Sequence, residues 1–470
     1  MSATATTEKK YLKWYQKLAY GSGDLASNCS YGLVSSFVLL YLTGTLGLDS
    51  AIIGSLMLAS KVLDGISDVI FGTLIDRTHS KLGKARPWML FGQVGVSLCL
   101  FLLFAIPAGS TTMQYIYFFI VYTALNAVFY TANGIAYSSL VALITKNNNE
   151  RVQLGSFRFM FAVVTNIFMG FAVTGMVEKF GSGAAGWRTT ALIFAIVGLV
   201  VNTISCLAVK ELPEEELSGN TSEAAEEGKA VAEEKKHGFA ETAKILVHNK
   251  YYLMILAIYI VYYIMSNLTT GAGVFCATYY WGDGSLLGQF SMMKMFPVII
   301  ALAIAPVLIK KTGSMQKVNF WGYAISSVLG IPMIYFAMQK NLSMFLLFMF
   351  IKGIFAGTLS GSLNALIAEA SGYTTRTTGI HMDGMMYSCS SLGVKVGGGI
   401  GTAAVGWLLK LGGFVGTATV QSESAIRMIF NLYITFPFVI GIIITVLLAF
   451  LDVEKVNKKW DAEHQKEAQA

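Results

Sequence analysis

Three ionisable residues, Lys61, Asp64 and Asp68, lie inside an otherwise apolar stretch of the chain. Their spacing of i, i+3 and i+7 places them on one face of a helix. Two carboxylates one turn apart repel each other in a medium of low dielectric constant. They stay charged together only when a cation joins them; otherwise one of them holds a proton. The pair is therefore suited to binding Na⁺, Li⁺ or H⁺, and the alternative is a static ion-pair cluster that holds helices together.

The elements that position these residues are predicted to be membrane helices. The chain has 470 residues, of which 54% are hydrophobic and 13% are charged, whereas an ordinary soluble protein carries about 25% charged residues. Its apolar stretches reach about 20 residues, the length that a helix needs to cross roughly 30 Å of hydrocarbon. This excludes a soluble enzyme, a disordered protein and a disulfide-rich secreted module. The net charge of +7 is spread over loops, so nucleic acid is not an expected partner.

The pattern predicts an all-α membrane protein with twelve transmembrane helices in two six-helix halves. The predicted spans are residues 18–46, 51–76, 87–108, 113–144, 152–177, 187–209, 250–280, 285–310, 317–338, 342–370, 379–410 and 424–451. The five cysteines lie singly inside apolar stretches, so neither a disulfide framework nor a metal site is expected.

The loops between the spans fall into a basic set and a sparse set. Lysine and arginine gather in the N-terminus, in loops 77–86, 146–151 and 310–317, and in the C-terminal tail. Because basic loops stay in the cytoplasm, both termini are predicted to be cytoplasmic, which an even number of spans also requires. The expected location is the inner (plasma) membrane.

An acidic, apolar-poor segment divides the chain at its midpoint. We predict an N-terminal half with the cation site (1–210), a flexible or loosely helical cytoplasmic linker (211–249), a C-terminal half (250–452) and a cytoplasmic tail (453–470). A faint repeat relates residues 74–78, after the second span, to residues 308–312, after the eighth. Two related six-helix halves are the architecture of major facilitator transporters.

The loop after the second span begins with an acid and continues with several cations. Such a loop favours a charge latch between helices that opens when the halves rock; the alternative is orientation by positive charge alone. Glu369 and Arg376 flank the cytoplasmic end of the tenth span. They form either an inner gate or a plain ion pair in the loop. The predicted gating residues are Asp76, Arg77, Lys84, Arg86, Glu369 and Arg376.

The chain resembles the glycoside–pentoside–hexuronide:cation symporters, the branch of the major facilitator superfamily that includes the melibiose permease and the glucuronide transporters. The motifs are Tyr-Gly-Ser-Gly-Asp at 20–24, Asp64-x-x-x-Asp68, Gly-Lys-x-Arg-Pro at 83–87, Tyr130-Thr131, Ser139-Leu140, Arg158 and Lys-x-Gly-Gly at 395–398. The resemblance implies uptake of a sugar or sugar derivative, driven by a co-transported cation through alternating access. No enzymatic activity and no cofactor are expected.

The resemblance also implies two sites. The cation site comprises Asp64, Asp68 and Thr131, with Ser67 where the melibiose permease has an asparagine. The substrate site comprises Asn28, Arg158, Tyr130, Tyr137, Gly134, Ser138, Lys395 and Asp24. The two tyrosines either line the sugar cavity or pack in an interfacial belt.

Three positions depart from the melibiose permease. Asn28 and Gly134 replace acids that hold sugar hydroxyls there, and Ser138 replaces a tryptophan. Arg158 thereby loses those acidic partners and would suit a bidentate carboxylate or sulfonate, which favours an anionic glycoside or hexuronide. The alternative is that Asp24, one turn before Asn28, pairs with Arg158 and leaves no anion site.

We therefore expect a secondary active transporter that couples sugar uptake to Na⁺, Li⁺ or H⁺ and works as a monomer in the lipid bilayer. An exporter of drugs or metabolites with the same fold is one alternative. A membrane sensor that signals through the linker is another.

Overall fold

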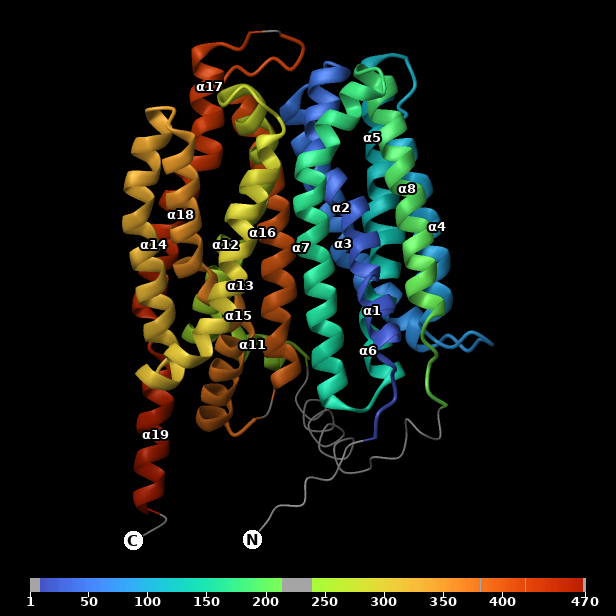
Figure 1. The fold of residues 1–470 in the computed structure, drawn as a ribbon. Helices are drawn as coiled ribbons and strands as arrows, with labels where there is room; N and C mark the ends of the chain where they lie inside the picture. The colour runs from blue at the N-terminus through green and yellow to red at the C-terminus, as the bar shows by residue number, and fades with distance from the viewer. Residues whose placement is uncertain (1–8, 214–238, 381, 419, 468–470) are drawn as a thin grey trace. The chain divides into compact units, whose positions relative to one another are not determined.

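A computed structural model describes residues 9–213 and 239–467, apart from 381 and 419, and these residues form helices without strands (Figure 1). Within this part of the chain, eleven helices are long and apolar enough to cross a membrane. Helix α3 (Ser50–Asp76) is not among the eleven. Its 27 residues suffice for a span, and it carries Lys61, Asp64 and Asp68. The prediction of an all-α membrane protein is confirmed.

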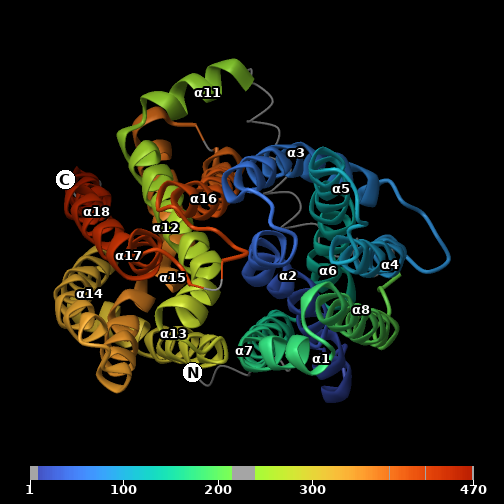
Figure 2. The same cartoon turned by 90° about the horizontal axis from the view of Figure 1, so that it is seen from above.

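The chain forms two compact units. The first comprises Met1–Asn220, Ala277–Gly288 and Gly406–Ala425. Its main helices are α1 (Trp14–Gly21), α2 (Gly23–Leu40), α3, α4 (Arg86–Leu103), α5 (Thr111–Thr123), α6 (Thr131–Ile144), α7 (Asn148–Lys179) and α8 (Gly183–Leu207). Helix α4 packs against α6 and α8, and α2 packs against α7 and α8 (Figure 2).

The second unit comprises Thr221–Cys276, Gln289–Val405 and Ile426–Ala470. The helices that contribute to it are α11 (Phe239–His248), α12 (Lys250–Phe275), α13 (Leu286–Thr312), α14 (Met315–Met338), α15 (Leu342–Thr378), α16 (Asp383–Leu411), α17 (Glu423–Phe430), α18 (Phe436–Phe450) and α19 (Val453–Glu467). The predicted linker falls mostly at residues 214–238, which lie outside the described residues, and the predicted tail contains α19.

Among the described residues, four long helices contain a π-helical segment, in which the backbone accommodates an extra residue per turn. The segments are η1 (Tyr41–Thr45), η2 (Ala124–Tyr130), η3 (Cys276–Tyr280) and η4 (Asn431–Thr435). Segments η1 and η3 end the first long helix of each predicted half. Segment η2 directly precedes Thr131 and therefore sets the direction in which that residue points.

Glu211, the first residue of the predicted linker, stabilises the loop after α3. Its carboxylate accepts hydrogen bonds from the backbone N–H groups of Lys84, Ala85 and Arg86 at 2.7–3.0 Å, at the N-terminus of α4. It also fills the space that a Cβ at position 83 would need. Because Gly83 has a φ of +110°, in the region that favours glycine, a residue with a side chain would fit poorly there. A negative charge at a helix N-terminus is favourable because the exposed N–H groups carry partial positive charge.

Replacing Glu211 by alanine is expected to lower the free energy of unfolding by about 1–2 kcal/mol, since three backbone donors lose their acceptor. The measurement is the thermal unfolding temperature of the purified protein in detergent. Glu178→Gln, which removes an exposed acid at the end of α7, is the control. An unchanged unfolding temperature for Glu211→Ala would contradict this role.

Candidate functional site

Asp64 and Thr131 are brought together by α3 and α6. The Thr131 hydroxyl donates a hydrogen bond of 2.6 Å to Asp64 Oδ1. Lys61 Nζ lies 3.7 Å from Asp64 Oδ2, and the side chains of Lys61 and Asp64 are only 17% and 13% exposed. Asp68 follows one turn later and is half-buried. The hydroxyl of Ser67, by contrast, donates to the backbone carbonyl of Asp64 at 2.9 Å and not to a carboxylate.

The π-helical segment η2 explains how Thr131 reaches this position. Its hydroxyl oxygen lies 2.9 Å from the carbonyl of Asn126, five residues earlier, which matches the wider turn of a π-helix. The opposite face of α3 presents exposed apolar side chains, among them Val62, Ile66 and Val69. The charged face therefore points inward and the apolar face outward, and the three charged residues share one face, as the spacing predicts.

Two tyrosines border this cluster. The Tyr31 ring lies 5.8 Å from Lys61 Nζ and stacks on Tyr130 with ring centroids 5.5 Å apart. The sequence analysis missed Tyr31, because a tyrosine in an apolar helix gives no local signal of its partners. Among the described residues, no group of three or more His, Cys, Asp or Glu side chains that could hold a metal ion is found. All five cysteines are free and buried.

Asp24 and Arg158 form an ion pair between α2 and α7. Arg158 Nε donates to Asp24 Oδ2 at 2.6 Å, and the two side chains are 26% and 18% exposed. The guanidinium also lies over the Tyr137 ring at 4.2 Å, and the Tyr137 hydroxyl bonds the carbonyl of Tyr20 at 2.8 Å. Of the two alternatives for Arg158, the structure shows the pair with Asp24.

A set of polar groups lies next to this pair. Asn28 accepts a hydrogen bond of 2.9 Å from the amide of Asn166. A Cβ added at Gly134 would meet nothing within 4 Å, and Ser138, one turn later on α6, is exposed. Asn166 was missed by the sequence analysis. It lies about two turns after Arg158 on α7, so the same-face argument was available for it.

The predicted gating residues have other partners than expected. Arg376 forms a bidentate pair with Asp461 of α19 at 2.9–3.0 Å, and Glu369 accepts from Asn457 of α19 at 2.9 Å. Glu369 and Arg376 thus hold α19 against the end of α15 and do not pair with each other.

The predicted latch in the loop after α3 is not assembled among the described residues. Asp76 and Arg77 are exposed and have no ion-pair partner there. The Arg86 guanidinium is buried and donates to the carbonyl of Cys206 at 3.2 Å, and Lys84 uses its backbone N–H for Glu211. Lys395 lies on α16, and its predicted approach to both sites stays a prediction.

Asp49, outside the spans, caps the N-terminus of α3. It accepts from Ala51 N and Ile52 N at 2.9 and 3.3 Å and pairs with Lys410 Nζ at 2.6 Å. Burial opposes the charge, but the bond from Lys410 and those from the backbone outweigh it and hold the pKa of this carboxyl below its ordinary value.

The charge of Asp49 is expected to stabilise the protein above about pH 4 and to stop doing so as the pH falls through the lowered pKa. Asp49→Asn keeps the cap and removes the charge. It should reduce the free energy of unfolding by about 0.5–1 kcal/mol near pH 7, with the difference vanishing in acid. Thermal unfolding from pH 7 to pH 3 measures it, and a difference independent of pH would rule out the charge as its cause.

The many long apolar helices, with a few ionisable residues inside the spans, are typical of a multi-pass membrane transporter. Residues 19–455 match the family described as MFS/sugar transport protein, and the chain belongs to this family. The resemblance to glycoside–pentoside–hexuronide symporters is thereby confirmed. The family consists of transporters, so the protein is not an enzyme and its class is sugar-type, cation-coupled symport.

Similar proteins agree with this assignment. The chain is 26% identical to the isoprimeverose transporter of Lactiplantibacillus pentosus, over 98% of this chain and 93% of that protein. It is 24% identical to the putative glycoside/cation symporter YagG of Escherichia coli (strain K12), over 90% and 88%. A solved bacterial homolog of the human lysosomal transporter Spinster has the same fold, with a TM-score of 0.66 at 13% identity, covering 95% of this chain and 97% of that one.

Proposed function

We propose that the protein takes up a sugar or glycoside together with one monovalent cation, which binds at Asp64, Asp68 and Thr131. The observation that carries this proposal is the Thr131 hydroxyl bonded to the Asp64 carboxylate at 2.6 Å, opposite Lys61. Carboxylate and hydroxyl oxygens are suitable ligands for the hard cations Na⁺ and Li⁺, and a carboxylate can hold a proton instead.

The sugar is proposed to bind beside this site, along the faces of α2, α6 and α7 that carry the polar groups. Asn28 and Asn166 offer amide donors and acceptors, and Arg158 has N–H donors beyond the one that Asp24 uses. The open space at Gly134 gives room for a ring, and Tyr130 and Tyr137 offer aromatic faces. Alternating access follows if cation binding removes the carboxylate repulsion and positions α3 against α6. Coupling then requires that cation and sugar raise each other's affinity by the same factor.

The surroundings of the transporter are proposed from its loops. Basic loops place both termini in the cytoplasm and the protein in the inner (plasma) membrane, as a monomer. The residue ranges 1–210 and 250–452 are proposed as the two halves that rock. The similarity to a putative glycoside/cation symporter supports a coupling cation but does not identify the ion.

Tracer uptake into proteoliposomes tests the proposal. Glycosides are supplied one at a time, under an inward gradient of Na⁺, Li⁺ or H⁺. Accumulation above equilibrium with one cation and collapse with an ionophore are expected. Extrusion would instead indicate an exporter, and transport in neither direction would indicate a sensor.

A further inference from the structure

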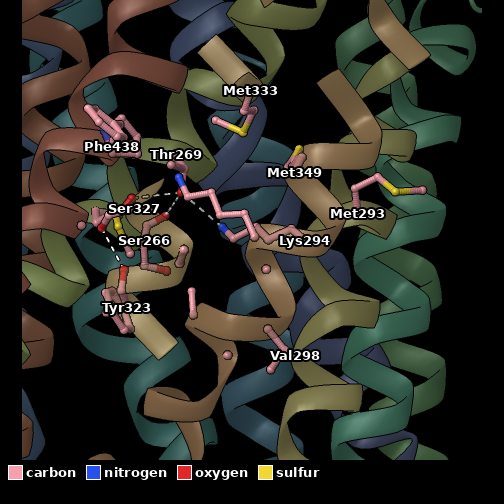
Figure 3. Close-up of a pocket in the computed structure, with 18 of the residues that line it drawn as sticks. Ser266, Thr269, Met293, Lys294, Val298, Tyr323, Ser327, Met333, Met349 and Phe438 are labelled. Atoms are coloured by element: carbon pink, nitrogen blue, oxygen red, sulfur yellow. Dashed lines mark hydrogen bonds between the residues drawn. The ribbon is translucent and has the colours of Figure 1, made fainter. Parts of the chain in front are cut away.

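The second unit contains a cavity of about 190 Å³ that the proposed site does not use. Its walls come from α12, α13, α14, α15, η4 and α18. An apolar cavity of about 150 Å³ is known to hold benzene, so this one has room for roughly one six-membered ring. Much of the wall is apolar and adaptable because four of its residues are methionines. Figure 3 shows three of them, Met293, Met333 and Met349, around the side chain of Lys294.

Two lysines line this cavity, Lys294 on α13 and Lys352 on α15. Lys294 Nζ donates to the hydroxyls of Thr269 and Thr270 at 3.3 and 3.1 Å, which is longer than typical bonds from an ammonium group to an anionic oxygen. In the described part of the chain, Lys352 has no hydrogen-bond or ion-pair partner. The sequence analysis missed both residues, although each lies in a predicted span.

None of the described residues that line the cavity is acidic. Two ammonium groups inside a membrane helix bundle are costly without a counter-charge, and they also repel each other. The hydroxyls around them accept hydrogen bonds but carry no charge. Ser327 donates to the carbonyl of Tyr323 at 2.8 Å, and Tyr262 and Ser360 share a hydrogen bond of 2.7 Å; hydroxyls bonded in this way can still accept from an ammonium group but do not balance its charge. The chemistry that matches two ammonium groups is therefore a group with negative charge and several acceptor oxygens.

We propose that Lys294 and Lys352 form a second solute site inside this unit, separate from the sugar site proposed in the first unit, which binds an oxyanion (a carboxylate, sulfonate or phosphate) attached to a body of about one ring. This inference goes beyond the proposed transport function. An oxyanion has enough lone pairs to accept from both ammonium groups, and the methionine-rich wall covers the rest of the ring. The same chemistry is present in a phospholipid headgroup, which is the other source of such an anion.

The experiment compares matched neutral and acidic sugars, such as glucose with glucuronate, galactose with galacturonate, and their methyl glycosides. Binding is measured by competition in nanodiscs made only of phosphatidylcholine. The variants are Lys294→Met, Lys352→Met and the double variant, in which methionine keeps most of the side-chain length. Lys310→Met is the control, since Lys310 is an exposed lysine on the same helix.

For the wild type, at least one acidic sugar is expected to bind about tenfold or more tightly than its neutral partner. Each cavity variant should remove this preference, and Lys310→Met should keep it. In the absence of solute the cavity variants should unfold at the same temperature as the wild type or higher, because they remove unpaired charges. Cation-stimulated uptake of a neutral sugar should survive in the double variant, which separates failure of this inference from failure of the transport function.

Three results would overturn the assignment. One is a wild type in which no acidic sugar binds more tightly than its neutral partner. Another is a double variant that keeps the full preference. The third comes from repeating the series in nanodiscs with phosphatidylglycerol: if the lysine variants change only the response to this anionic lipid, the cavity holds a lipid phosphate and not the solute.

Discussion

Asp64→Asn is expected to weaken cation-stimulated uptake by about 10- to 100-fold, with the protein still inserted in the membrane. The substitution removes a charged oxygen ligand of the cation. A hydrogen bond to a charged group is worth about 1.5–3 kcal/mol, and a loss of that size in the binding free energy corresponds to this factor in affinity. It also leaves Lys61 without the carboxylate that lies 3.7 Å away. The measurement is initial uptake rate against cation concentration in proteoliposomes. Thr131→Val, which removes only a neutral hydroxyl, should have a smaller effect in the same direction.

The matched variant for this prediction is Lys61→Met, because it changes the charge of the cluster in the opposite direction. If the acids bind the coupling cation, removing the ammonium raises cation affinity, whereas Asp64→Asn lowers it. A static ion-pair cluster predicts something else: both variants reduce thermal stability and neither alters cation dependence. Unchanged cation dependence in both variants would thus reject the cation site and favour the static cluster. Glu178→Gln serves as the exposed-acid control.

Asp24→Ala is expected to produce the second large effect, a loss of roughly 3 kcal/mol in the free energy of unfolding. Breaking a buried ion pair costs about 3–5 kcal/mol, because the remaining charge stays desolvated. The lower end of this range applies because water still reaches part of both side chains: Asp24 is 18% and Arg158 is 26% exposed. The Tyr137 ring beneath the guanidinium offers only partial compensation. Thermal unfolding of Asp24→Asn, of Arg158→Gln and of the double variant Asp24→Asn/Arg158→Gln forms a double-mutant cycle.

The double variant should regain much of the lost stability, because no unpaired charge remains. A cycle without coupling energy would contradict the pair.

Arg158→Ala also reports on the substrate: since Asp24 already occupies this guanidinium, uptake of neutral and acidic sugars should fall equally. A selective loss of acidic sugars would instead place the anion site at Arg158.

The charged residues show how far sequence reasoning reached. Lys61, Asp64 and Asp68 were identifiable because a charge inside an apolar stretch is a local signal. The contact of Asp64 with Thr131 followed from a family resemblance and is present in the structure. Lys294 and Lys352 carry the same local signal, but the resemblance directed attention to the acids of the first unit.

Other partners depend on how helices pair, which no local pattern encodes. Tyr31 and Asn166 are neutral residues. The contact of Tyr31 with Lys61 exists only because α2 approaches α3 at this point, and that of Asn166 with Asn28 because α2 packs against α7. Likewise, Glu369 and Arg376 bind α19, a helix in a segment that composition alone described as a tail. Glu211 resembles its acidic neighbours in sequence, yet it is fixed by three backbone donors.

The π-helical segment η2 makes the fourth span sensitive to chain length as well as to residue type. Each residue of an α-helix turns the chain by about 100°, and the wider π-helical turn accommodates one extra residue. If residues 124–130 formed a regular α-helix at unchanged chain length, every side chain on one side of the segment would rotate by about that angle relative to the other side. Thr131 would turn away from Asp64 although neither residue had changed. Helical phase is thus a property that this transporter must preserve, in addition to the chemistry of its side chains.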